Sequence, residues 1–338
     1  MRNAVVGLAL LGAVALAACQ DNASPTAEPL ATNPALAKAK AQPALKGTPT
    51  ERAAQIAARV NARLEASGST KRLDEVWMFT VGQGTDPYRR LRTGPRWSHP
   101  RSLTYMIDQD YTTDVPAAQV HAAIAASFER HDAVPGISLN LTELPYNGGN
   151  NDVLDGVILN TAGECVDIVD LDSDILNSYD PATGALDFDI ITDNYFGGWY
   201  EPIYFENCLG SPDIIGVTWT FSDVDGALGE GTDGYRDRIY TEQYYNNGFD
   251  WVDGGSPFLS DLMDIQSIVT HEAGHAMGLG HFGGPNHYPG GQPFKLQPNG
   301  RVFDPEAVMN PFYLGGDKRE LYPTDIAGLK ALYASKTK

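Results

Sequence analysis

The stretch His271-Glu272-Ala-Gly-His275-Ala-Met-Gly278-Leu-Gly-His281 carries the most specific chemistry in this chain of 338 residues. On a helix, His271 and His275 lie four residues apart and project from one face, about one turn from each other. Gly278 can take the left-handed conformation that ends a helix and turns the chain back toward the metal with His281. Three imidazoles with an open fourth position are typical of a catalytic zinc site. We predict one Zn²⁺, held by His271, His275 and His281.

Glu272 lies beside the first histidine, where its carboxylate can hold and deprotonate a metal-bound water without being a ligand. The pattern HExxH alone is short and arises by chance in unrelated chains. The glycine and the third histidine at fixed offsets make the longer pattern far more specific. Glu272 is therefore the predicted catalytic base.

The residues before the motif favour a helix with one buried face. Apolar residues recur there at spacings of three and four, and Asp261 and Asp264 fall in the expected first turn, where carboxylates suit the helix dipole. Ser260 or Asp261 is the expected N-cap. The apolar residues of this face are Leu262, Ile265, Ile268, Val269, Ala273 and Ala276.

This motif resembles the signature of the metzincin metallopeptidases, and other segments resemble their matrixin branch. Met309, in Ala-Val-Met-Asn-Pro, matches the methionine of the turn beneath the metal, and Pro311-Phe-Tyr313 matches the segment that lines the substrate pocket. Residues 322–333 resemble the C-terminal helix of the family, and Trp97 with residues 103–107 resembles the first strand of its catalytic domain. The resemblance extends from about Trp97 to the C-terminus and is weak in the middle.

The resemblance implies an α+β fold with a twisted, mostly parallel sheet, an antiparallel edge strand, an active-site helix, a Met-turn and a C-terminal helix. It also implies a zinc endopeptidase that acts on protein or peptide substrates. The chain departs from the family in three places: a cysteine-switch motif is absent, Phe282 replaces the usual serine, and the His-x-Asp pattern of a second zinc is missing. Four other histidines (His99, His121, His131 and His287) have no ligand spacing, so we expect them to be ordinary surface or helix histidines.

Strand-like runs recur between residues 141 and 255. In metzincins one antiparallel strand forms the edge of the sheet above the cleft and pairs with an extended substrate. We assign this edge to residues 238–244, because they lie one connection before the active-site helix.

Two acidic segments are candidate calcium sites. Asp223, Asp225, Glu230 and Asp233 lie among glycines in a loop whose oxygen-rich, turning character suits Ca²⁺, and a similar loop binds calcium in matrixins. Asp170, Asp172 and Asp174 form a weaker second candidate. Neither fits the twelve-residue EF-hand pattern, so a solvated acidic loop stays an alternative for both.

The first residues indicate export. Arg2 precedes an apolar run over residues 4–18 that is too short to span a bilayer, so residues 1–18 are predicted to be a signal peptide. Leu-Ala-Ala-Cys19 is similar to a bacterial lipobox, which implies lipidation at Cys19 and an extracytoplasmic, membrane-anchored protein, with the outer membrane or cell surface favoured. An ordinary signal peptide with a chance cysteine is the alternative.

The chain then divides into three further segments. Residues 19–48, rich in Ala, Pro, Thr and Lys, are the expected flexible tether, and residues 97–338 the catalytic domain. Residues 49–96 contain a helix-prone stretch over 50–67 and a strand-like run over 77–81. They are either a pro-segment that covers the cleft or an extension that packs on the domain, and the sequence leaves both open.

Cysteine count and charge agree with this assignment. With Cys19 acylated, Cys165 and Cys208 remain as an even pair in an oxidising compartment, and a disulfide is favoured over two free thiols. The net charge of −19 argues against a nucleic-acid partner. The oligomeric state is not readable from the sequence.

Two other functions compete with the endopeptidase. A surface-binding lipoprotein could keep the fold without catalysis, although the presence of all three histidines together with Glu272 argues against this. A zinc peptidase with a glutamate as third ligand could use Glu306 or Glu320, but neither lies on a convincing helix.

Overall fold

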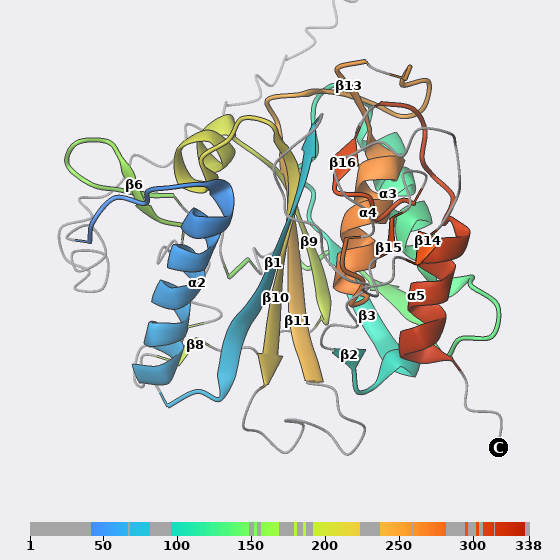
Figure 1. The fold of residues 1–338 in the computed structure, drawn as a ribbon, viewed down its shortest axis with the longest axis horizontal. Coiled ribbons are helices and arrows are strands. Elements are labelled where there is room, and N and C mark those ends of the chain that lie inside the picture. The colour runs from blue at the N-terminus through green and yellow to red at the C-terminus, as the bar shows by residue number, and fades with distance from the viewer. Residues whose placement is uncertain are drawn as a thin grey trace, which may run out of the picture.

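An eight-stranded mixed sheet forms the centre of the molecule, with helices against both of its faces (Figure 1). The structure is a computed structural model, and its elements are described within the following residues: 42–66, 68–81, 96–148, 152–153, 157–168, 179–180, 185–186, 192–223, 237–258, 260–281, 295–296, 302–303, 307–313 and 315–334.

Seven strands follow one another across this sheet in the order β16-β1-β10-β11-β9-β3-β4, and β2 pairs separately with β11. Five of the seven pairings are parallel, and the two antiparallel ones both involve β10. The α+β class and the mostly parallel sheet are thus as predicted. The bounds are β16 Phe312–Tyr313, β1 Lys71–Val81, β10 Ile214–Asp223, β11 Asp237–Asn246, β9 Asn194–Tyr200, β3 Leu103–Ile107, β4 Leu141–Leu144 and β2 Arg96–Trp97.

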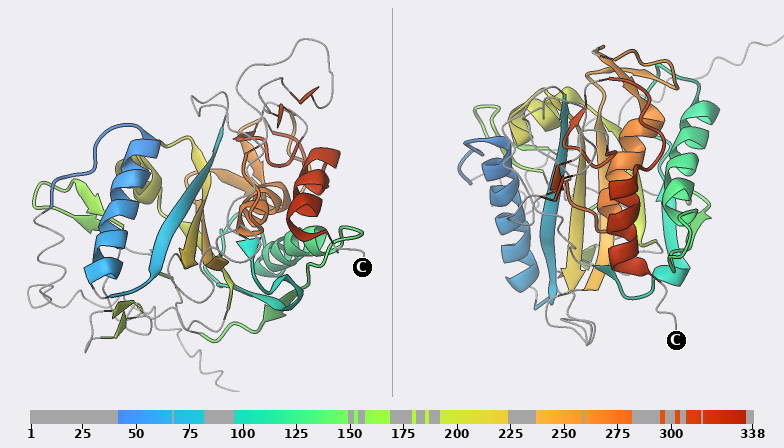
Figure 2. Two further views of the ribbon diagram at one scale, coloured as in Figure 1. Left: turned by 60° about the horizontal axis from the view of Figure 1, so that its bottom comes forward. Right: turned by 45° about the vertical axis from the view of Figure 1, so that its right-hand side comes forward.

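The helices form two layers, one on each side of the sheet (Figure 2). Helix α2 and the short π-helical segment η4 cover one face, and α3, α4 and α5 cover the other. These elements span α2 Pro49–Ala66, η4 Tyr204–Leu209, α3 Ala117–Asp132, α4 Ile265–Ala276 and α5 Pro323–Tyr333, with a 3-10 turn η2 at Pro100–Ser102. Four strand pairs lie outside the main sheet: β5 Ile158–Leu159 with β6 Cys165–Asp167, β7 Tyr179–Asp180 with β8 Ala185–Leu186, β12 Asp250–Val252 with β13 Leu262–Asp264, and β14 Lys295–Leu296 with β15 Val302–Phe303.

The predicted edge strand over residues 238–244 is wrong. These residues lie in β11, which is an interior strand between β10 and β9. The antiparallel strand is instead β10, and its outer edge is covered by β1, which comes from far earlier in the chain. Pairing between distant segments decides which strand is interior, and the order of elements near the motif does not reveal it.

Residues 49–81 form an α2–β1 unit that packs on the same sheet as the rest of the chain. The residues Ala53, Ile56, Val60 and Leu64, at spacings of three and four, are the buried face of α2. They join an apolar cluster with Leu209 and other side chains of η4 and the sheet. Leu45 is also buried, and its N–H donates to the carbonyl of Cys165 at 2.9 Å. The packed part of the chain therefore begins a few residues before the predicted boundary at 48.

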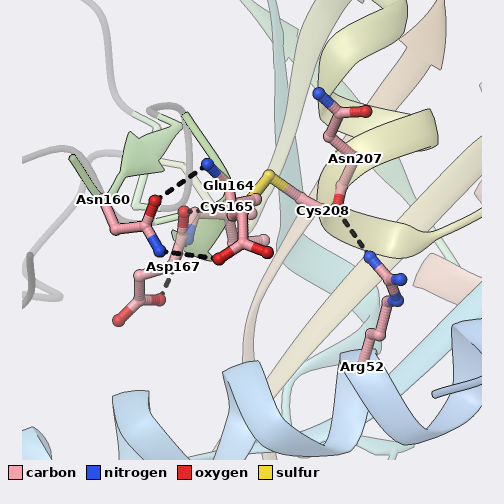
Figure 3. Close-up of a disulfide and its surroundings, with 8 residues drawn as sticks. Arg52, Asn160, Glu164, Cys165, Asp167, Asn207 and Cys208 are labelled. Carbon is pink, nitrogen blue, oxygen red and sulfur yellow. Dashed lines mark hydrogen bonds between the residues drawn. A yellow bond between two sulfur atoms is a disulfide. The ribbon is translucent and has the colours of Figure 1, made fainter. Parts of the chain in front are cut away.

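A disulfide joins Cys165 to Cys208, as the cysteine count predicts, with the two Cα atoms 5.2 Å apart (Figure 3). It links β6 to η4 beside helix α2. Arg52 Nη1 donates to the carbonyl of Asn207 at 2.7 Å, and Arg63 Nη1 pairs with Asp167 at 2.8 Å. The disulfide therefore stands on the same face of the sheet as α2 and helps to hold that helix in place.

Several predicted features lie outside the described residues. These are the signal peptide with Cys19, the loop residues Asp225, Glu230 and Asp233, and the second acidic segment with Asp170, Asp172 and Asp174. Asp223 is described and ends strand β10. Among the described helices, none is long and apolar enough to cross a membrane.

Candidate metal centre

Helix α4 carries the motif, and it begins later than the sequence suggests. Its N-cap is Asp264, whose carboxylate accepts the N–H of Ser267 at 3.0 Å. Ser260 and Asp261 are too early for this role, because residues 262–264 form strand β13 and pair in parallel with β12. Arg319 Nε donates to the same carboxylate at 3.0 Å and fixes the capping group.

The other end of α4 turns at Gly278, as predicted. The helix ends at Ala276, and Gly278 has a φ of 93°, in the left-handed region that favours glycine. Two side chains bind the last carbonyls: Trp97 Nε1 donates to Ala276 at 2.9 Å, and Tyr333 Oη donates to Met277 at 2.7 Å. The turn that delivers His281 is thus held by residues that lie far from it in the sequence, one before the motif and one after it.

The three predicted ligand histidines converge on one point. The Nε2 atoms are 3.0 Å apart for His271 and His275, 3.1 Å for His275 and His281, and 3.2 Å for His271 and His281. Tetrahedral zinc with bonds of about 2.0–2.1 Å requires separations of about 3.3 Å. Within the described residues, they are the only group of three metal-ligating side chains found close enough together to share an ion. The donor set therefore fits Zn²⁺.

Backbone carbonyls fix the orientation of two of these rings. His271 Nδ1 donates to the carbonyl of Val308 at 2.6 Å, and His275 Nδ1 donates to that of Leu279 at 2.8 Å. A proton on Nδ1 leaves the lone pair of Nε2 free for a metal. Burial, and then the neighbouring histidines, lower the pKa of both rings well below the usual value, which keeps them neutral and able to ligate.

Glu272 lies beside the triad in a buried position. Thr218 of β10 donates a hydrogen bond from its hydroxyl to Oε2. Oε1 is buried, and no described side chain or backbone group bonds it. Burial raises the pKa of the carboxyl to about 8, and the Thr218 hydrogen bond lowers it in part. A Cβ at Gly216 would lie 2.9 Å from Oε1, so glycine leaves room for the carboxylate.

The turn that contains Met309 lies against α4, and α5 holds it in place. Met309 is fully buried, and a Cβ on Gly274 would come within 2.2 Å of its Sδ. Asp325, at the start of α5, accepts the N–H groups of Val308 at 2.9 Å and Met309 at 3.1 Å. The acidic start of this helix was visible in the sequence, but its role in fixing the turn was not.

Pro311 and Tyr313 follow the turn with Met309, in the segment that ends in β16. The hydroxyl of Tyr313 donates to the carbonyl of Gly316 at 2.9 Å. Its ring meets that of Phe79 edge-on, with centroids 6.0 Å apart. The carbonyl of Pro311 accepts the N–H of Thr80 at 3.3 Å. Both predicted pocket residues are therefore in contact with strand β1.

Two aromatic residues of β1 also contact the triad, and the sequence analysis missed both. Trp77 stacks on His275, with centroids 4.9 Å apart, and Phe79 stacks on His271 at 3.7 Å. The sequence signal was the alternation of residues 73–79, which places every second side chain on one face of a strand. What that face would contact depends on strand pairing.

Of the two glutamates considered as a third ligand, the described one does not reach the triad. Glu320, the alternative third ligand, is largely exposed and pairs with Arg130 at 2.8 Å. Glu306 lies outside the described residues. Among the remaining histidines, His131 is fully buried on α3 rather than at the surface, His99 and His121 pair with Asp193 and Glu143, and His287 is outside the described residues.

Comparison with models of protein families and with curated proteins finds no match to this chain. The functional argument therefore depends on the geometry of the centre itself.

Proposed function

We propose that this protein is a zinc-dependent endopeptidase of the metzincin type, similar to the matrixins. The observation that carries the proposal is the convergence of three imidazoles on one point beside a buried carboxylate with an unbonded oxygen. A Zn²⁺ ion bound there would lower the pKa of a bound water and polarise a peptide carbonyl.

The residues of this chain supply the proton transfers and the positioning. Thr218 holds Oε2 of Glu272, so Oε1 is the atom that accepts the proton of the attacking water and returns it to the departing amine. The carboxyl must be ionised to accept this proton. Its pKa of about 8 reflects burial, and a cation on the adjacent histidines favours the ionised form. Pro311 and Tyr313 shape the pocket for the side chain that follows the cleaved bond.

An extracytoplasmic, membrane-anchored location belongs to the same proposal. The Cys165–Cys208 disulfide supports it, because disulfides persist in oxidising compartments. The proposal also includes Ca²⁺ at Asp223 and the acidic residues that follow it, because carboxylate oxygens are the ligands this ion prefers.

Zinc binding and peptide cleavage test the proposal together. Calorimetry with the apoprotein should give one zinc per chain, and His275→Ala should abolish this binding. Glu272→Gln should still bind zinc but lose roughly 10²–10⁴-fold in cleavage of a peptide library. If Glu272→Gln cleaves as well as the unaltered protein, or if zinc binds equally well without His275, the proposed centre is wrong.

A further inference from the structure

The outer edge of β10 is the path that an extended substrate would take to the metal centre. Thr218 and Gly216 of this strand contact Glu272, so β10 is the strand next to the catalytic carboxylate. A peptide whose carbonyl must reach the triad can pair with this edge by strand addition. That edge is occupied in the structure by β1 of the same chain (Figure 1).

Strand β1 fills this path along its whole length. It pairs with β10 in antiparallel fashion from Lys71, opposite Asp223, to Thr80, opposite Ile214. On its other side it pairs in parallel with β16, where Thr80 lies opposite Phe312. The strand is therefore held between the wall next to Glu272 and the segment that contains Pro311 and Tyr313.

The side chains of β1 alternate between two environments. Glu75, Trp77 and Phe79 are buried, and the last two lie against the histidines. Val76 and Met78 are half-buried and face α2, where they line a pocket of about 410 Å³ that Trp77 and His281 also border. Trp77 and Phe79 are therefore the side chains of this strand that stack on the ligand rings.

The two aromatic rings lie over the ligand rings. Trp77 is parallel to His275 within 5° and meets His281 edge-on at 5.3 Å, and Phe79 is parallel to His271 within 4°. Phe79 also touches Tyr313, so its ring occupies the pocket assigned to a substrate side chain. The histidines are at most 2% exposed in this arrangement.

We propose that β1 is an internal substrate mimic that closes the metal centre. The preferred substrates are then peptides that bind in its place. They carry two bulky aromatic side chains with one residue between them, as Trp77 and Phe79 are placed in β1. That the strand mimics a peptide substrate rests on the proposed function. That the strand covers the three histidines does not.

Closure by a strand of the same chain is hard to overcome with a free peptide. A tethered segment acts at an effective concentration in the millimolar range, so a dilute substrate competes poorly with it. Arg52 and Arg63 of α2 add contacts to the disulfide-linked segments behind the strand. The intact chain should therefore be weakly active until β1 is weakened or removed.

Zinc uptake by the apoprotein tests the closure without measuring activity. In stopped-flow experiments the uptake rate of the unaltered protein should level off at high zinc concentration, because opening of β1 becomes limiting. A rate that rises linearly over the whole range would overturn the closure.

Variants of the two faces of β1 provide a matched comparison. Trp77→Ala with Phe79→Ala should speed zinc uptake about tenfold or more. Without the two stacked rings, the tethered strand is held less firmly over the histidines and opens more often. Val76→Ala with Met78→Ala, on the opposite face of the same strand, should leave the rate near that of the unaltered protein. Equal rates for the two double variants would overturn the proposal. The single variants Trp77→Ala and Phe79→Ala replace the first pair if it does not fold.

A peptide library then separates the closure from the catalytic function. The Trp77→Ala/Phe79→Ala protein, loaded with zinc, should cleave peptides with two aromatic side chains one residue apart and should exceed the unaltered protein. Fast zinc uptake without any cleavage would refute the endopeptidase and leave the closure standing. Cleavage by the unaltered protein at the same rate as the variant would refute the closure alone.

Discussion

The two faces of the central sheet are stabilised in different ways. On the α2 side, an apolar cluster and the Cys165–Cys208 disulfide hold the layers together. On the α4 side there is also an apolar core, but the metal centre depends on directional hydrogen bonds: Asp325 and backbone carbonyls accept them, and Thr218 donates one. Changes on the α2 side should therefore alter the stability of the fold, and changes on the α4 side should alter the metal affinity.

Removal of the disulfide should give the largest loss of stability. Replacing Cys165 and Cys208 by alanine removes a cross-link over a sequence separation of 43 residues, worth about 4 kcal/mol in the chain-entropy model. Denaturant unfolding should show this loss, whereas zinc affinity of the folded variant should stay unchanged. A fall in zinc affinity without a loss of stability would show that the two faces are not independent.

Acid should destabilise the α4 side through His131. Burial lowers the pKa of this histidine from 6.5 to about 4, so the folded protein holds it neutral while the unfolded chain takes up a proton below pH 6.5. The stability that neutral His131 contributes is fully present above pH 6.5 and is lost as the pH falls to 4. The free energy of unfolding should fall by about 3 kcal/mol over this range. Unfolding of the zinc-free protein measures this loss.

The comparison uses His131→Leu, which cannot take up the proton. The difference in unfolding free energy between the unaltered protein and His131→Leu should change by about 3 kcal/mol between pH 6.5 and 4. Other titrating groups cancel in the difference. A constant difference across this range would mean that His131 titrates normally.

Asp325→Asn should affect the metal centre more than the fold. Val308 and Met309 donate to different oxygens of Asp325, and the amide nitrogen of asparagine replaces one of these acceptors with a donor. The turn therefore loses a hydrogen bond, and zinc affinity should fall about 10–100-fold. The stability loss should be about 2 kcal/mol. Competition with a zinc indicator measures the affinity.

Asp317 provides the matched control for this change. Its carboxylate accepts the N–H groups of Gly255 and Ser256 at 3.0 and 3.1 Å, away from the triad. Asp317→Asn should leave the zinc affinity unchanged. The role of Asp325 is refuted if both variants lose affinity equally.

The smallest effect is expected at Gly274. Alanine there gains about 1 kcal/mol in helix propensity, but its Cβ would press on the buried Met309 Sδ, and overpacking costs roughly 1–3 kcal/mol. A net loss of about 1 kcal/mol should appear in thermal unfolding, with weaker zinc binding as Met309 shifts. A variant more stable than the unaltered protein would show that the Met-turn adapts without cost.

The sequence predicted the parts of the site that depend on local spacing. The helix with His271 and His275 and the turn at Gly278 follow from residues close together in the chain. The mixed α+β class was also readable. In contrast, the edge of the sheet was assigned to β11, because nothing near residues 238–244 reveals that β1 pairs with β10. Thr218 beside Glu272 and the aromatic rings of β1 were missed for the same reason: their partners come from distant strands.

The last helix has a further consequence for where the chain can be shortened. The hydroxyl of Tyr333 donates to Met277, directly before the turn that places His281. A truncation that includes this tyrosine removes a support of the motif helix, although it leaves the motif itself intact. The end of α5 is thus, in engineering terms, a part of the metal centre.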